Sequence, residues 1–389
     1  MHRKVLAAGA ALLLAACPAA AQQKSIKIGF VSTFSGPTAV IGNDMRNAFE
    51  LALDHMGRKM GGLPIEVIYE DDQQKPEVGK QKTEKLIESD KVDFIVGYIW
   101  SNVLLASVKP IADSKTILVV ANAGASQVAG ELCSPYFYST SWTNEQNPRA
   151  VAEYMNKKGI KTVYLIGPNY AAGKENLAGL KEFFKGKVVG EDYTKWPDQL
   201  DFSAELSKAR AANPDAIYTF YPGAAGIQFL NQYAQNGLQG KIPLYTTFVI
   251  DSLSLPRLRD NAVGVISALE WGADLPNDTN KKFVGDFETK FKTEPSFYAA
   301  QTYDAANLVA SGVARVKGDL SNKVAVQAAL KKADFRSVRG SFKFGNNNYP
   351  IQNFYMQEVV KDGTAYKLKT FAIAMENAID ANHTKCPMK

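Results

Sequence analysis

Histidine and cysteine are scarce in this chain of 389 residues, which contains three of each. His2 falls in an N-terminal leader, and His55 and His383 are expected at a helix end and in a polar tail, where structural or solvated roles are favoured. The GxSxG, HExxH, P-loop and GxGxxG patterns are absent. The sequence therefore predicts no catalytic centre, no metal site and no bound cofactor.

Long apolar runs and clusters of basic residues are also missing. Beyond the leader, no apolar stretch approaches the roughly 18 residues of a membrane-spanning helix. The formal net charge is +6; without Arg3 and Lys4 of the leader, 43 basic and 39 acidic residues leave +4. No run concentrates this charge, so nucleic-acid binding is not expected.

The first residues have the pattern of a secretory signal peptide. A basic segment (2–4) precedes an apolar segment (5–16) and a small-residue cleavage site at Ala19-Ala20-Ala21. We predict a signal peptide over residues 1–21 and a soluble periplasmic protein. An alternative is a lipoprotein anchored through Cys17, because residues 14–17 read Leu-Ala-Ala-Cys; Pro18 after the cysteine favours the first interpretation.

Export gives the remaining cysteines a meaning, because disulfides persist in oxidising compartments. After cleavage only Cys133 and Cys386 remain. We predict a disulfide that joins the C-terminal tail to the loop after the fourth strand. Two free thiols are the alternative.

Buried apolar runs alternate with helix-period segments, a pattern typical of parallel α/β sheets. The first series has predicted strands at 26–34, 63–70, 92–98 and 116–121 and helices at 42–58, 76–89 and 101–114. The second has strands at 162–167, 188–193, 216–221 and 243–248 and helices at 146–158, 170–184, 201–212 and 224–236. The fold class is therefore α/β, with two doubly wound parallel-sheet lobes.

The remaining segments are too few for a third lobe. Helices are expected at 281–292, 298–316 and 322–332, followed by a hairpin-like region at 340–371. We expect them to complete the first two lobes, giving lobe 1 (26–144 plus 274–342), lobe 2 (145–273 plus 350–373) and a tail (374–389). Several crossings then form a hinge, and ligands bind beyond the carboxyl ends of the strands.

Small and hydroxyl residues follow two strands of the first lobe. Ser101 begins one predicted helix, and Ala125 and Ser126 begin another. Unpaired N–H groups at helix N-termini favour anions, so these residues form a candidate carboxylate receptor. Alternatively, the serines only cap their helices.

Aromatic residues fall near several strand ends: Trp100, Tyr170, Tyr221, Phe248 and Trp271. Any one of them could simply belong to the core. Five near one predicted cleft favour a planar ligand, on which aromatic rings stack.

The chain resembles the type I periplasmic solute-binding proteins of the branched-chain amino acid ABC transporter family. The resemblance is carried by IKIGFVSTFSGPTAVIGNDMRNAFELALD, VDFIVGYIWSNVLLA, VVANAGAS, TVYLIGPNYAAGKENLAGL and FYPGAAGIQFLNQYAQNGL. It implies a monomer that closes two lobes around a ligand and delivers it to permease subunits. It also implies a ligand carboxylate held by Ser101, Gly124, Ala125 and Ser126, with cleft aromatics at Tyr170, Tyr221 and Tyr298.

One position departs from the family pattern. Amino-acid binders of the family place a carboxylate against the ligand ammonium, whereas this chain has Phe248. A buried ammonium without a partner costs several kcal/mol, and a cation–π contact returns only about 0.5–2 kcal/mol. The sequence thus favours an aromatic acid such as a benzoate, hydroxybenzoate or cinnamate. An amino acid paired with Asp251 or Asp304 is the alternative, and an extracytoplasmic sensor is a second one.

Overall fold

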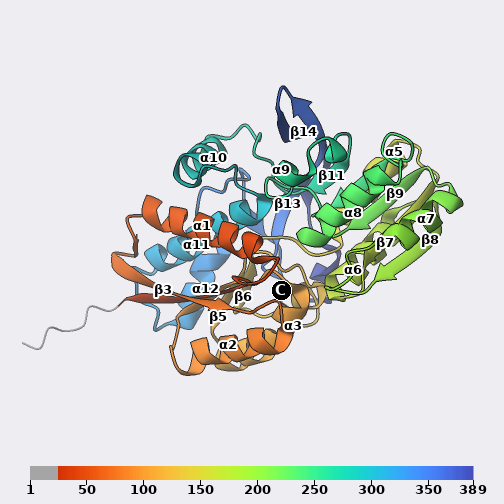
Figure 1. Cartoon of the computed structure of the whole chain (residues 1–389). Helices are drawn as coiled ribbons and strands as arrows, with labels where there is room; N and C mark the ends of the chain where they lie inside the picture. Colours follow the sequence, from red (N-terminus) through yellow and green to blue (C-terminus); the bar gives the residue numbers. More distant parts are fainter. Residues whose placement is uncertain (1–24, 389) are drawn as a thin grey trace, which may run out of the picture.

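The computed structural model describes residues 25–388, which form two α/β lobes side by side (Figure 1). The predicted signal peptide and the alternative lipid anchor at Cys17 lie outside the described residues.

Lobe 1 is built on a six-stranded sheet with the order β2-β3-β1-β4-β5-β6. The strands are β1 (Ile26–Ser32), β2 (Lys59–Met60), β3 (Leu63–Asp71), β4 (Phe94–Gly97), β5 (Ile117–Val120) and β6 (Phe137–Ser139). The helices are α1 (Ala39–His55), α2 (Pro76–Glu88), α3 (Ser101–Ser114), α4 (Ser126–Ala129), α11 (Phe297–Arg315) and α12 (Lys323–Lys331). Only β2 runs antiparallel to its neighbour. The short strands β2 and β6 were not predicted, and α4 begins at Ser126, where a helix start was expected.

Lobe 2 contains the larger sheet, with the order β12-β13-β11-β10-β9-β7-β8 and β14 paired to β13. The strands are β7 (Thr162–Pro168), β8 (Lys187–Thr194), β9 (Ala216–Phe220), β10 (Leu244–Thr247), β11 (Ile266–Leu269), β12 (Lys343–Phe344), β13 (Pro350–Asp362) and β14 (Ala365–Ala378). The helices are α5 (Gln146–Lys157), α6 (Ala171–Phe183), α7 (Ser203–Ala212), α8 (Ala224–Gln235), α9 (Leu255–Leu258) and the 3₁₀ helix η1 (Arg259–Ala262). The prediction missed β11, to which β13 pairs antiparallel, so this sheet is mixed.

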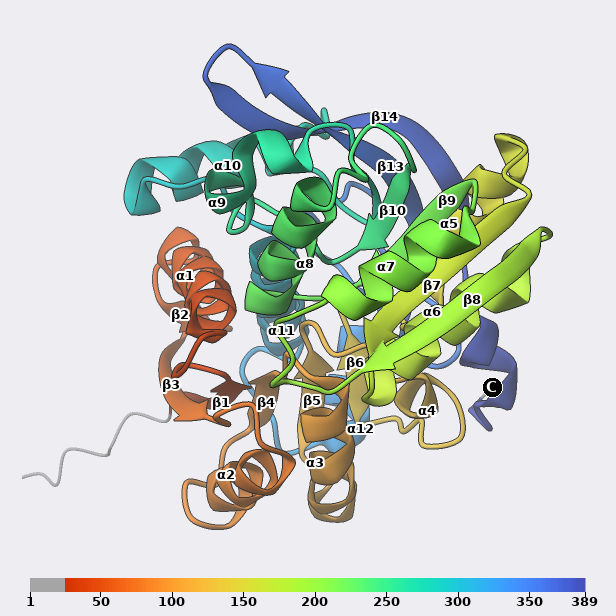
Figure 2. The same ribbon diagram turned by 45° about the vertical axis from the view of Figure 1, so that its right-hand side comes forward.

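The central strands are buried because helices cover both faces of each sheet. Every residue of β4, β5 and β9 is buried. Helix α1 buries one face through Ile41, Met45, Ala48, Phe49 and Ala52, whose spacing follows the helical period. Helix α1 packs against α11 (Figure 2). Helix α11 begins more than 240 residues after the end of α1, where the chain has returned to lobe 1.

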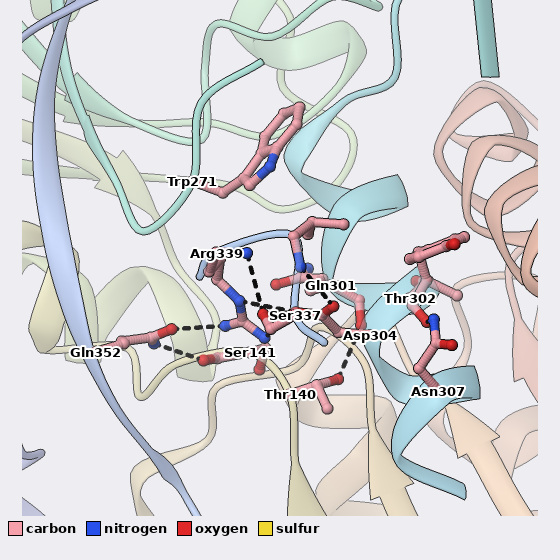
Figure 3. Close-up of polar contacts among 12 residues, drawn as sticks. Thr140, Ser141, Trp271, Gln301, Thr302, Asp304, Asn307, Ser337, Arg339 and Gln352 are labelled. Atoms are coloured by element: carbon pink, nitrogen blue, oxygen red, sulfur yellow. Dashed lines mark hydrogen bonds and ion pairs between the residues drawn. The ribbon is translucent and has the colours of Figure 1, made fainter. Parts of the chain in front are cut away.

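The chain crosses between the lobes three times, after β6, after β11 and after α12. The second crossing leads into α10 (Asp278–Phe291), which contacts α1. Figure 3 shows a buried polar network that joins the first and third crossings. The Arg339 guanidinium donates to Asp304 Oδ2 (3.0 Å) and to Gln352 Oε1 (2.6 Å), and Gln352 Nε2 donates to the Ser141 carbonyl oxygen (2.7 Å).

The C-terminal tail is attached to lobe 1 by a disulfide between Cys133 and Cys386, whose Cα atoms are 5.7 Å apart. The tail forms the 3₁₀ helix η2 (Ala381–Lys385), which contacts α4. The covalent bond therefore fixes the end of the chain beside the loop that follows β5.

Candidate functional site

A small cavity lies between the lobes, at the carboxyl ends of their parallel strands, where open α/β sheets bind ligands. It encloses about 320 Å³ of space not filled by atoms, including the space at its mouth. The lining residues come from both lobes, the first crossing and α11; they are Ile99, Trp100, Ser101, Asn122, Gly124, Trp142, Asn144, Tyr170, Ala172, Phe220, Pro222, Phe248 and Tyr298. Six of these residues are aromatic, and none of them is Asp, Glu, Lys, Arg or His.

The aromatic rings form a continuous wall. Trp142 stacks on Phe248 with centroids 4.4 Å apart, and Phe248 meets Phe220 edge-on at 5.8 Å. Tyr170 lies nearly parallel to Phe220 at 6.3 Å. The backbone of Phe248 is left-handed (φ +60°), a conformation that costs a non-glycine residue about 1 kcal/mol or more. The fold holds this strain and thereby keeps the Phe248 ring in the wall.

The wall carries hydrogen-bond donors that the protein itself does not use. The Trp142 indole N–H is buried and has no acceptor among the described residues. The hydroxyls of Tyr170 and Tyr298 likewise have no hydrogen-bond partner in the part of the chain that the structure describes, and burial raises the pKa of both groups, so they remain neutral donors. The Trp100 indole is different, since it donates to Thr33 Oγ1 at 2.8 Å.

Ser101 is the first residue of α3, so its hydroxyl group is a donor at the N-terminus of this helix. Trp100, and not Ser101, occupies the N-cap position of α3, so the capping interpretation does not describe Ser101. The Ser101 Oγ atom accepts from Asn144 Nδ2 at 3.0 Å, which leaves the hydroxyl proton free to donate into the cavity. Gly124 lets the side chains of Trp142 and Asn144 lie close to its backbone, because a Cβ there would lie 2.8 Å from both Trp142 Nε1 and Asn144 Oδ1. This arrangement suits a small anion held by neutral donors.

A sequence profile of the periplasmic binding protein family matches residues 25–364. The chain belongs to this family. It is 28% identical over 386 residues to the Leu/Ile/Val-binding protein homolog 6 of Brucella melitensis, covering 95% of this chain and 97% of that protein.

Two solved structures of solute-binding proteins of ABC transporters are also similar. One is from R. palustris, in complex with benzoate, with a TM-score of 0.89, 32% identity and coverage of 94% of this chain and 100% of that one. The other is from Rhodopseudomonas palustris BisB5, in complex with 3,4-dihydroxybenzoic acid, with a TM-score of 0.85, 30% identity and coverage of 92% and 99%. The protein is thus an ABC-transporter solute-binding protein, not an enzyme. In its described part, no helix is sufficiently long and apolar to traverse a bilayer.

In this periplasmic binding protein, six of the predicted site residues line the cavity. They are Trp100, Ser101, Gly124, Tyr170, Phe248 and Tyr298. Two predicted carboxylate ligands do not: Ala125 is buried beside the cavity, and Ser126 turns toward lobe 2. Its N–H and Oγ both donate to Glu175 Oε2, at 3.1 and 3.0 Å.

Tyr221, another predicted site residue, also lies outside the cavity. Its hydroxyl shares a hydrogen bond with Thr194 at 2.7 Å, and its ring packs against Phe202 and Phe229 in the core of lobe 2. Successive residues at a strand end point to opposite sides, so Phe220 and Pro222 face the cavity instead.

Three further residues that the sequence suggested for the binding site bond to other parts of the protein. Trp271 donates to Asn280 Oδ1 at 2.7 Å, and Asp304 pairs with Arg339. Asp251 accepts from the Ser254 amide at 2.7 Å, and burial raises its pKa to about 6. None of the three lines the cavity. Among the described residues, the two acids considered as partners for an amino-acid ammonium, Asp251 and Asp304, are therefore not part of the cavity lining.

The sequence interpretation missed Trp142, Asn144 and Phe220. Trp142 and Asn144 follow β6, a three-residue strand too short to be recognised by its pattern. The only available signal was the polar and aromatic run Ser139 to Asn144 between two predicted elements. Phe220 was assigned to the sheet interior because the apolar run of β9 continues without alternation.

Proposed function

We propose that this solute-binding protein captures a small aromatic carboxylate, such as a benzoate or hydroxybenzoate, by closing its two lobes around it. The observation that carries the proposal is the cavity wall, with six aromatic residues and no acidic side chain. An amino acid would bury its ammonium there without a counter-charge, at a cost of several kcal/mol. The benzoate and 3,4-dihydroxybenzoic acid complexes of the similar R. palustris proteins support the same ligand class.

In this proposal the ligand ring lies in the aromatic wall, and its carboxylate faces Ser101 and Gly124. The Ser101 hydroxyl and the Trp142 indole donate to the carboxylate oxygens, and the N-terminus of α3 supplies a favourable dipole. Tyr170 and Tyr298 are the donors available to a ring hydroxyl. Because ligand contacts come from both lobes, binding favours the closed form.

We propose that its partner is the permease subunits of an ABC importer; the family assignment and the similarity to an ABC-transporter solute-binding protein support this. We further propose that the leader exports the protein to the periplasm, where the closed, ligand-loaded form docks on the permease.

Calorimetry with benzoate, 4-hydroxybenzoate, phenylalanine and leucine tests the proposal. We expect the two aromatic acids to bind at least tenfold more tightly than either amino acid. Ser101→Ala combined with Ala125→Leu should weaken benzoate binding at least tenfold, because it removes one donor and crowds the turn beside Gly124. Preferential binding of leucine or phenylalanine would reject the aromatic-acid assignment.

A further inference from the structure

One carboxylate of lobe 2 reaches across the cleft to lobe 1. Glu175 lies on α6, and its Oε2 atom accepts from the Ser126 N–H (3.1 Å), the Ser126 Oγ (3.0 Å) and Asn144 Nδ2 (2.8 Å). Hydrogen bonds to an ionised carboxylate are roughly twice as strong as neutral ones. Ser126, which the family resemblance assigns to the ligand carboxylate, therefore binds a carboxylate of the protein itself.

Asn144 connects this contact to the binding cavity. Its Nδ2 atom donates to Glu175 and also to Ser101 Oγ at 3.0 Å. A carboxylate can only accept, so Glu175 dictates that the NH₂ group of Asn144, not its oxygen, faces Ser101. Ser101 Oγ then acts as the acceptor, and its own proton is free for the ligand. If the amide turned over, Asn144 Oδ1 would take that proton.

We propose that Glu175 is a positioning residue that couples lobe closure to the orientation of the Ser101 hydroxyl. Opening the cleft separates Glu175 on α6 from Ser126 on α4, so the contact exists only when the lobes meet. Its two effects are to stabilise the closed form and to present the Ser101 proton to an incoming carboxylate. The second effect rests on the aromatic-carboxylate function proposed above; the first does not.

The closure effect is measured without ligand. Spin labels at Lys109→Cys on α3 and Lys208→Cys on α7 report the distance between the lobes, since both side chains are exposed. We expect Glu175→Gln to lower the population of the short, closed distance. The matched control is Glu182→Gln, an exposed residue of the same helix. Identical distance distributions in the unmodified background and both variants would overturn the closure effect.

The positioning effect is measured with benzoate as the probe. Glu175→Gln should weaken binding on the order of tenfold, because glutamine can donate to Asn144 Oδ1 and so allow its amide to turn over. Glu182→Gln should change the affinity less than twofold. In a Ser101→Ala background, Glu175→Gln should lose most of its effect. If the loss of benzoate affinity in the double variant equals the sum of the losses in the two single variants, Glu175 does not act through Ser101.

The two proposals fail in distinguishable ways. If the unsubstituted protein binds no benzoate, the proposed function and the positioning effect both fail, and the spin-label distances still decide the closure effect. If benzoate binds equally to the unsubstituted protein and to Glu175→Gln, the proposed function stands and the positioning role is rejected. Thermal unfolding confirms that each variant is folded before either measurement.

Discussion

Trp142 and Phe248 stack on each other in the wall of the binding cavity, with their ring planes 22° apart. Trp142 comes from the first crossing between the lobes, and Phe248 follows β10 of lobe 2. Phe248 stands where the family resemblance places the acid of the amino-acid binders. We propose that this aromatic pair takes the place of an ammonium-binding carboxylate and makes the cavity less polar.

Replacing this ring with an acid tests its part in selectivity. Phe248→Glu should reduce benzoate affinity at least 100-fold, because a carboxylate beside Trp142 repels an anionic ligand and removes the stacking surface. The control Phe248→Leu keeps an apolar side chain and should lose only about tenfold. Calorimetry measures both variants. Equal affinities in the two variants would show that charge at this position does not select the ligand.

The unpartnered indole N–H of Trp142 gives a second prediction. Trp142→Phe keeps a stacking ring but removes the donor, so benzoate affinity should fall about tenfold while the melting temperature changes little. Trp271→Phe is the matched control, since its indole bonds to Asn280 outside the cavity. That variant should lose stability and keep its affinity. The reverse pattern would place the ligand donor elsewhere.

Stability should depend on pH through Asp44. Burial raises the pKa of Asp44 from 3.8 to about 7, and the carboxyl group contacts the Ser296 hydroxyl. Between about pH 4 and 7 the native state holds a proton that the unfolded chain has released, so the free energy of unfolding falls as the pH rises through this window. Above pH 7 the loss is complete.

Asp44→Asn removes the titrating carboxyl group. The free energy of unfolding should then change less between about pH 4 and 7. Relative to the unsubstituted protein, the variant should gain on the order of 1–4 kcal/mol between pH 4.5 and pH 8. Urea unfolding at the two pH values measures the difference. The exposed Asp113→Asn is the control and should give parallel profiles. A constant difference between Asp44→Asn and the unsubstituted protein would rule out the titration of Asp44.

The disulfide should contribute to stability and not to binding. Cys133 and Cys386 are 253 residues apart in sequence, so the bond removes much of the freedom of the unfolded chain. Replacing both with serine should lower the free energy of unfolding by about 2–5 kcal/mol. Benzoate affinity should stay within twofold, because neither cysteine lines the cavity. Denaturant unfolding and calorimetry give the two values; an unchanged midpoint would contradict the prediction.

Much of the fold could be predicted because its long elements have clear periods. The apolar runs of β1, β3, β7 and β9 and the amphipathic α1 were recognised within a few residues. The strands β2 and β6 were missed, because two or three residues are too few to show a pattern. The four-residue strand β11 was missed as well, although β4 and β5, which have the same length, were predicted. The order of the strands in each sheet depends on long-range pairing that no local segment contains.

The binding site divides in the same way. Ser101, Tyr170 and Phe248 could be located because they directly follow or end recognisable strands. Tyr221 lies in the core and not in the cavity lining, because successive residues at a strand end point alternately to the cavity and to the core. Trp142 and Asn144 come from a crossing whose path is set only when the lobes pack.

The sequence by itself determined an α/β protein of two lobes and its family. The lobes follow from local periodicity, and the family follows from the resemblance of several sequence segments. Only the tertiary structure decided that Ser126 bonds to Glu175 and that Asp304 bonds to Arg339. Such pairings bring together residues 35 to 49 positions apart, and their geometry depends on how whole helices and lobes pack.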